Sequence, residues 1–334
     1  MAQTLLIAFG RGEKDEILIG YDGSTCSDAA LDDLKLAGLP EEVEAVVMSV
    51  AEVWLPPPPE NETLSEYAQD LQTHPQPFKA YQTNAKAITE AETLAKHAEG
   101  RLMKMFPAWR VKAEANYGSP AWEILSKANQ MKADLIVVGS HGRTAIGRFF
   151  LGSISNKVLT EAHCSVRVAR GRIEVDPIPS RVIIGFDGSP GANAAVEAVA
   201  ARNWREGSEV RLIAVADPIL PTAIGLFVPP VTSWVDEEMK SESERVKKLA
   251  GESLELLRSK GLEAEIKVFA GNPKQILVEE AERWHADSIF VGANRFGSRI
   301  EKILLGSVSA AVAARSHCSV EVVRHKKTSL TETV

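Results

Sequence analysis

One loop of this chain has the residue types and spacing for binding an anion: Gly139, Gly142, Gly152 and Ser153. The loop follows the β-branched run 133–138, which is typical of a buried strand, and precedes the helix-like run 154–162. Glycine lets backbone N–H groups approach an anion closely, and the start of a helix adds partial positive charge. The pattern therefore predicts a phosphate-binding loop. His141 is interpreted as a plain loop residue, because no nucleophile or acid adjoins it in the pattern.

Much of this sequence recurs later in the chain. Asp22-Gly-Ser, after the first apolar run, recurs 165 positions on as Asp187-Gly-Ser. The segment His163–Arg170 recurs as His317–Arg324. Residues matching the first glycine loop also recur, and they are Gly292, Gly306 and Ser307. A repeat this long and ordered predicts two copies of one module.

Each copy alternates short apolar runs with helical stretches. In the first copy the strand-like runs are 17–19, 46–50, 135–138 and 166–168, and the helical stretches are 29–37, 85–106 and 121–131. Alternation of this kind is typical of an α/β protein whose parallel sheet is covered by helices on both faces. We expect a first domain at 1–171, a proline-containing linker at 172–180, a second domain at 181–326 and a tail at 327–334.

Composition and charge narrow the function classes. The 334 residues carry a net charge of −7, which argues against a nonspecific nucleic-acid binder, since such proteins need a basic field. The N-terminus has no basic segment before its short apolar run, and no long uncharged apolar stretch follows, so we expect no membrane span. The widely spaced Cys26, Cys164 and Cys318 are typical of free thiols in a reducing compartment, which favours the cytoplasm.

A metal site held by protein side chains is not expected. Histidine precedes cysteine in both copies, at His163-Cys164 and His317-Cys318. Adjacent residues on a strand point to opposite faces, so one such pair cannot chelate an ion easily.

These motifs resemble the universal stress protein family, in particular its members with two modules in one chain. The resemblance covers the chain from about Glu16 to Arg324. ATP-binding members carry Gly, two residues, Gly, nine residues, Gly and then Ser or Thr, and the loop 139–153 meets that spacing in full. The resemblance implies two repeated doubly wound domains, each a mainly parallel five-stranded sheet flanked by helices, as in the adenine nucleotide alpha-hydrolase-like fold.

The resemblance also implies ATP, with Mg²⁺ or Mn²⁺, at the first copy. Asp22 would hold the adenosine end, Val50 would meet the adenine edge through its backbone, and Gly139 would lie on the ribose side. The triphosphate would lie along Gly142, Gly152 and Ser153. Arg143, in the same loop, could offset phosphate charge. Asp-Gly-Ser also has a purely structural interpretation, because Asp-Gly is a turn dipeptide and Ser caps helices.

The second copy departs from the motif. Asp187, Val215, Gly306 and Ser307 occupy the expected places, but Arg295 stands where the second glycine belongs. The spacing from Gly292 to Gly306 is also one residue longer. The first copy is therefore the surer ATP site, and the second is degenerate or altered.

The resemblance further implies that the last strands of the two modules, 165–170 and 319–324, pair antiparallel in an intramolecular pseudo-dimer, which leaves a further homodimer open. The function expected is a cytoplasmic ATP-binding stress-response protein that acts through its nucleotide-dependent state or through partner binding. One alternative is a slow ATPase or an enzyme that phosphorylates itself, although no dedicated general base is evident. A scaffold that acts without nucleotide is the other.

Overall fold

The computed structural model describes residues 15–53, 63, 66, 69, 79–142, 151–170, 179–216, 244–293 and 305–324, with the backbone alone at 79–83. Of the features expected from sequence, Arg143, Arg295, most of the linker and the tail lie outside the described residues.

The first half of the chain forms five parallel strands in the order β3-β2-β1-β4-β5. These strands are β1 (Asp15–Gly20), β2 (Val43–Ala51), β3 (Arg110–Tyr117), β4 (Leu135–Gly139) and β5 (Ser165–Ala169). The helices between them are α1 (Thr25–Asp33), the 3₁₀ turn η1 (Leu34–Leu36), α3 (Lys79–Met105), α4 (Pro120–Gln130) and α5 (Ser153–Glu161). The chain order reverses between β1 and β4, which is the doubly wound arrangement expected from sequence.

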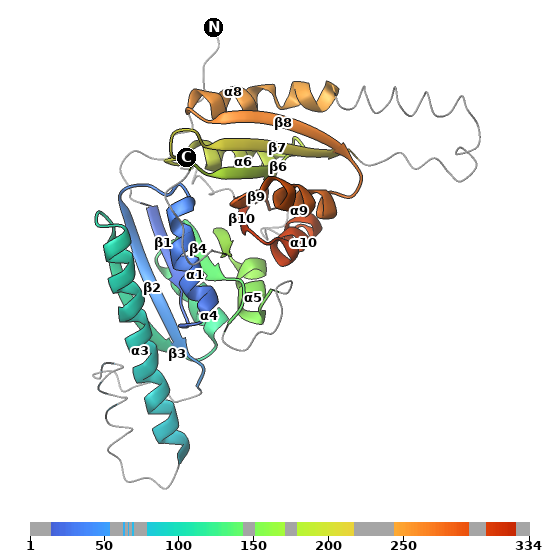
Figure 1. Ribbon diagram of the computed structural model, residues 1–334. Helices are drawn as coiled ribbons and strands as arrows, with labels where there is room; N and C mark the ends of the chain where they lie inside the picture. Colours follow the sequence, from blue (N-terminus) through green and yellow to red (C-terminus); the bar gives the residue numbers. More distant parts are fainter. Residues whose placement is uncertain are drawn as a thin grey trace, which may run out of the picture.

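The second half repeats this plan, with strand order β10-β9-β6-β7-β8. Its strands are β6 (Arg181–Gly185), β7 (Glu209–Ala216), β8 (Glu263–Ala270), β9 (Ser288–Gly292) and β10 (Ser319–Val323). Its helices are α6 (Pro190–Ala200), α8 (Gly251–Ser259), α9 (Pro273–Trp284) and α10 (Ser307–Arg315). Figure 1 shows α8 lying along β8, as α3 lies along β2 and β3 in the first half. The expected fold class, two repeated α/β units, is confirmed.

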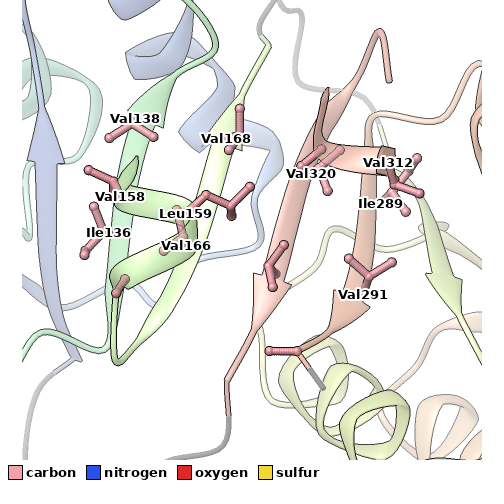
Figure 2. Packing of buried hydrophobic residues seen from close by; sticks show 14 of the residues in the cluster. Ile136, Val138, Val158, Leu159, Val166, Val168, Ile289, Val291, Val312 and Val320 are labelled. Atoms are coloured by element: carbon pink, nitrogen blue, oxygen red, sulfur yellow. The ribbon is translucent and has the colours of Figure 1, made fainter. Parts of the chain in front are cut away.

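The two halves join in one ten-stranded sheet, because β5 and β10 lie side by side and antiparallel. The register sets Val168 opposite Val320 and Val166 opposite Val322. Figure 2 shows these strands next to each other, with α5 and α10 carrying Leu159 and Val312 toward the same face. One continuous apolar cluster therefore crosses from one half to the other.

The central strands of each half are buried on both faces. On β1, Leu18 packs into the cluster under α4 and α5, whereas Ile17 and Ile19 pack into a second cluster under α1 and α3. All three side chains are buried. A run of consecutive apolar residues is what a strand covered by helices on both sides requires. The sheet thus forms the middle layer, and its loops reach solvent at the strand ends.

Candidate functional site

A cavity of about 340 Å³ opens at the carboxyl ends of β1, β2 and β4 in the first half. It lies where the strand order reverses, which is where open α/β sheets bind ligands. Four residues predicted from sequence line it, namely Asp22, Val50, Gly139 and Gly142. Residues far apart in the chain are thereby brought to one site.

Asp22 is held by a turn directly after β1. Its Oδ1 accepts a hydrogen bond from the Ser24 backbone N–H at 3.0 Å. Gly23 makes the turn possible, since it adopts φ +73°. Ser24 then caps α1, its hydroxyl accepting from the Ser27 N–H. Asp-Gly-Ser therefore does form a turn and a helix cap. The second carboxylate oxygen of Asp22 faces the glycine loop.

The glycine loop is closed at its base by two hydrogen bonds that join the end of β4 to the start of α5. The Ser155 hydroxyl donates to the Gly139 carbonyl at 2.6 Å, and the Gly152 N–H donates to the Ser140 carbonyl at 2.8 Å. A methyl group on Gly139 would lie 3.1 Å from the Cys26 carbonyl, so this glycine permits β4 to pack tightly against α1. Gly139 thus has a packing role in addition to its place in the cavity wall.

The start of α5 has no side-chain cap. Gly152 occupies the N-cap position in extended backbone and offers no hydrogen-bonding side chain, and Ser153, the first helical residue, is exposed. The first N–H groups of a helix lack intrahelical partners, and they are satisfied by a cap, by water or by a ligand. The N-cap residue of α5 therefore leaves these N–H groups without a side-chain acceptor, whereas Ser24 supplies one at the start of α1. Gly152 and Ser153 lie beside the cavity-lining Ile154 and Ser155 rather than in the lining itself.

The far wall of the cavity comes from α3, which sequence reasoning did not assign to the site. Ala87, Ala91 and Leu94 line the cavity from this helix, at spacings of four and three residues that place them on one helical face. The small side chains at this spacing were the available signal. Glu90 from α3 and Glu52, just after β2, add carboxylates to the lining. Together with Asp22 they make this wall acidic, which suits donor groups such as hydroxyls and amines.

His141 differs from its sequence interpretation. Its Nδ1 lies 3.0 Å from the hydroxyl of Ser140, so a potential nucleophile does adjoin it, and it lines the cavity. Burial, followed by the positive charge of Arg170, lowers the pKa of His141 from its ordinary value of 6.5. The imidazole is therefore mostly neutral near pH 7 and supplies no cation to a phosphate. Ser140 is buried, which limits its access to any substrate.

The corresponding positions of the second half occupy the same places in the fold. Asp187 follows β6 and accepts from the Ser189 N–H at 2.9 Å, Val215 lies in β7, and Ser307 begins α10 after Gly306. The Ser309 hydroxyl donates to the Gly292 carbonyl at 2.8 Å, matching Ser155 and Gly139.

The two halves differ at the end of the fourth strand. A methyl group on Gly292 would lie 2.2 Å from the carbonyl carbon of Gly191 in α6, well inside any allowed contact. Gly191 stands at the place of Cys26, so the helix approaches the strand more closely in the second half than in the first.

Among the residues described, no three His, Cys, Asp or Glu side chains gather as a metal site would require. Cys26, Cys164 and Cys318 are free thiols. None of the described helices combines the length and the apolar character that crossing a bilayer demands.

Comparison with known proteins identifies the family to which this architecture belongs. The model of the universal stress protein family matches twice, at residues 14–170 and 179–324. Universal stress protein Rv2005c of Mycobacterium tuberculosis is 29% identical over 317 residues, covering 92% of this chain and 96% of that protein. A universal stress protein of Mycolicibacterium smegmatis is 28% identical with the same coverage.

A solved structure shares the fold over nearly the whole chain. The crystal structure of a universal stress protein from Archaeoglobus fulgidus superposes with a TM-score of 0.61 at 20% identity, covering 94% of this chain and all of that one. The two family matches together span most of the sequence and coincide with the two halves of the sheet. The chain therefore belongs to the universal stress protein family, with two family-sized units in tandem.

Proposed function

We propose that the first half binds ATP in the cavity at the ends of β1, β2 and β4. The observation that carries the proposal is the convergence of Asp22, Val50 and the glycine loop on one cavity beside an uncapped helix start. The adenosine would lie between Asp22 and Val50, with Gly139 on its ribose side. The phosphates would extend along Gly142 toward Gly152 and Ser153, where Arg143 would add a positive charge.

The size and chemistry of the cavity support this assignment. Its volume of about 340 Å³ falls within the range of small-molecule sites. The Asp22, Glu52 and Glu90 carboxylates can accept hydrogen bonds from ribose hydroxyls or an adenine amine, but they would repel a bare triphosphate. A Mg²⁺ or Mn²⁺ ion bound with the nucleotide would neutralise part of the phosphate charge. The backbone N–H groups at the start of α5 would take the remaining negative charge.

Nucleotide preference for the first half over the second is part of the proposal. Gly142 leaves room beside Asp22, whereas Arg295 stands at the corresponding place of the second sequence motif. The tighter packing of Gly292 on Gly191 also distinguishes the second half. Asp187, Val215, Gly306 and Ser307 would then form an altered site with weaker affinity for ATP.

We propose that the protein acts in a stress response in the cytoplasm, and that its activity there depends on whether ATP is bound. The domains would span 1–171 and 181–326, joined by the linker 172–180 and followed by the tail 327–334. The antiparallel contact of β5 with β10 supports an intramolecular pseudo-dimer of these domains. In this arrangement ATP would change which partner proteins the chain binds, while its own two halves remain together.

Equilibrium binding of ATP with Mg²⁺ to the full chain tests the proposal, and the repeat supplies a matched control. Asp22→Ala and Asp187→Ala each remove a carboxylate that accepts from a serine N–H two residues on, at 3.0 and 2.9 Å. Asp22→Ala should weaken the tightest ATP binding about tenfold or more, about 1.4 kcal/mol, and Asp187→Ala should leave it unchanged. Absence of saturable binding by the wild type, or equal effects of the two variants, would overturn the assignment.

A further inference from the structure

The contact between the two halves contains charged side chains that are almost fully buried. Arg167 of β5 is 0% exposed, Glu321 of β10 is 1% exposed, and Asp33 at the end of α1 is 2% exposed. Charged residues are rarely buried to this degree unless they are paired. Since an apolar interface of the same shape would avoid the desolvation of these ions, their presence calls for a reason other than stability.

Arg167 and Glu321 face each other at the centre of the contact. The antiparallel register of β5 and β10 sets Arg167 directly opposite Glu321. These two residues are also equivalent positions of the sequence repeat, since His163–Arg170 corresponds to His317–Arg324. A position that pairs with its own equivalent lies on the axis relating the two halves. The guanidinium Nη1 lies 3.5 Å from Glu321 Oε2 across this axis.

Each of these ions has a second partner within its own half. Asp33 accepts from Arg167 through both carboxylate oxygens, at 2.7 Å from Nε and 3.2 Å from Nη2. Arg202, after α6, forms an ion pair with Glu321. Burial disfavours the charge on Arg167, but Asp33 and Glu321 raise its pKa above the ordinary value, so it stays charged.

These second partners also reach across the contact. The Arg202 Nη1 donates to the Ala37 carbonyl of the first half at 2.7 Å. The Ser319 hydroxyl of β10 donates to Asp33 Oδ1 at 2.6 Å. Asp33, Arg167, Glu321 and Arg202 therefore form one buried network, which we call the axis network.

The residues of the axis network are not conserved between the two copies of the sequence repeat. The position equivalent to Asp33 in the second half is Ala198, and the position equivalent to Arg202 in the first half is Ala37. At the axis itself the equivalent residues have opposite charges. Two first halves joined in the same way would bring Arg167 against a second Arg167, and two second halves would bring Glu321 against a second Glu321.

Four polar contacts between the halves, made by Arg170, Arg324 and two serines, are equivalent in both directions. Arg170 donates to the Ala313 carbonyl at the end of α10, and Arg324 donates to the Leu159 carbonyl at the end of α5. The hydroxyl of Ser319 accepts from the Arg170 N–H, and that of Ser165 accepts from the Arg324 N–H. These four contacts would form equally well between like halves, so they cannot select the partner. The Asn203 N–H, which donates to the Gly38 carbonyl at 2.8 Å, adds a one-directional contact but no charge.

We propose that the axis network selects the partner of each half. The β5 edge accepts a β10-type edge, which carries a carboxylate at the axis, and rejects a second β5-type edge, which carries a guanidinium. The surface therefore fits the second half of this chain, from the same molecule or from another copy, and excludes like pairs. Like charges held together out of water are strongly unfavourable, whereas the unlike pair is compensated.

The first test uses the full chain with a site-specific protease sequence placed in the segment 172–178. After cleavage, the halves are loosened in mild denaturant, returned to buffer and examined by native mass spectrometry, which separates unlike from like pairs by mass. We expect unlike pairs alone. Re-pairing of wild-type halves in the proportions of random association would overturn the proposal.

The same experiment on a variant with an apolar axis network asks whether the charges cause the selection. The variant combines Asp33→Leu, Arg167→Met, Arg202→Met and Glu321→Leu, which keep similar volumes. We expect like pairs to appear in this variant. Exclusive unlike pairing without the charges would also overturn the proposal.

The intact chain gives a second test that does not depend on re-pairing. Glu321→Arg sets a second guanidinium against Arg167 at the axis and removes the carboxylate that pairs with Arg202. Glu265→Arg makes the same change in the half-exposed pair with Arg211, away from the contact between the halves. Glu321→Arg should lower the urea midpoint severalfold more than Glu265→Arg does. Equal shifts would show that the axis tolerates like charges, and the proposal would fail.

Discussion

Asp22 and Gly142 lie face to face across the first-half cavity, so that a methyl group on the glycine would come within 3.1 Å of Asp22 Oδ2. The other carboxylate oxygen is bound by the Ser24 N–H. The carboxylate is thus held by its turn on one side and meets the glycine loop on the other. The adenosine end and the phosphate end of the proposed site are therefore adjacent at this pair.

Gly142→Ala should therefore weaken ATP binding without unfolding the protein. The added methyl must displace the Asp22 carboxylate by a few tenths of an ångström and take space at the loop. We expect about a tenfold loss of affinity, equal to about 1.4 kcal/mol, in isothermal titration calorimetry.

Gly100→Ala is the control for that substitution. Gly100 lies within α3, and a methyl group there would meet no heavy atom within 4 Å. This change should leave ATP affinity intact and stabilise the fold by roughly 0.5–1 kcal/mol, because alanine favours the helix. If Gly142→Ala bound ATP as tightly as Gly100→Ala, the glycine loop would not be part of the nucleotide site.

Arg324→Met should destabilise the contact between the halves. Arg324 is 5% exposed and donates to the carbonyl of Leu159, in the last turn of α5, and to that of Cys164, just before β5. Burial lowers its pKa to about 10, so the buried cation depends on these carbonyls for compensation. Its removal leaves buried acceptors without a donor, and we expect a loss of roughly 2–4 kcal/mol in urea unfolding.

Arg110→Met provides the comparison for Arg324. Arg110 is 70% exposed and pairs with Glu44 on the surface at 3.3 Å. Exposed pairs of this kind contribute roughly 0–1 kcal/mol. Similar unfolding midpoints for the two variants would contradict the capping role assigned to Arg324.

The strands that the sequence analysis located are those buried on both faces. The runs at 17–19, 46–50, 135–138 and 166–168 lie in β1, β2, β4 and β5, because burial on both sides demands consecutive apolar residues. The run that was missed became β3, where Arg110, Lys112 and Glu114 alternate with smaller residues. β3 is the outermost strand of the sheet, and an edge strand has no neighbour on one side and tolerates charge.

Some residues of the candidate site could likewise be predicted from the sequence, and others could not. Gly139 and Gly142 could be predicted from motif spacing, and Asp22 and Val50 from the resemblance to the family; all four line the cavity. The α3 wall could not, because it depends on how a long helix packs over the sheet. The burial of Arg167 was equally hidden, since a lone arginine between valines is typical of a surface-facing strand position. Only the register of β5 against β10 places it at the axis.

Gly38→Ala should be more harmful than its backbone conformation alone explains. Gly38 has φ +62°, and a methyl group on it would lie 2.8 Å from the ring of Trp204 in the other half. That ring is fixed by its Nε1–H, which donates to the Val199 carbonyl at 2.7 Å. We expect the free energy of unfolding to fall by roughly 1 kcal/mol because of backbone strain and by roughly a further 1–3 kcal/mol because of the steric clash.

Gly261→Ala separates these two contributions. Gly261 has φ +81°, but a methyl group there meets nothing within 4 Å, so only the strain remains. Thermal unfolding of both variants gives the difference that belongs to the Trp204 contact. Equal losses of stability in the two variants would mean that the indole ring moves aside without an energetic penalty. The contact between Gly38 and Trp204 would then contribute little to holding the halves together.

Two thiols, the half-buried Cys164 and the buried Cys318, should make the fold less stable as the pH rises from about 9 to about 11. Burial raises the pKa of Cys164 and of Cys318 from 9.0 to about 11. Between these values the unfolded thiols lose their protons while the folded thiols keep them. The native state then binds more protons, and the free energy of unfolding falls with pH. Each thiol should account for on the order of 2 kcal/mol across this window.

The double variant Cys164→Ala and Cys318→Ala isolates this effect. Tyr21, whose pKa burial and the Asp28 carboxylate raise to about 12, gives a loss in the same direction, which persists in the variant. Urea unfolding at several pH values should therefore show a steeper decline for the wild type than for the double variant between pH 9 and 11. Parallel declines would mean that the thiols reach solvent and ionise in the folded protein, contrary to the burial of Cys318 beside the axis network.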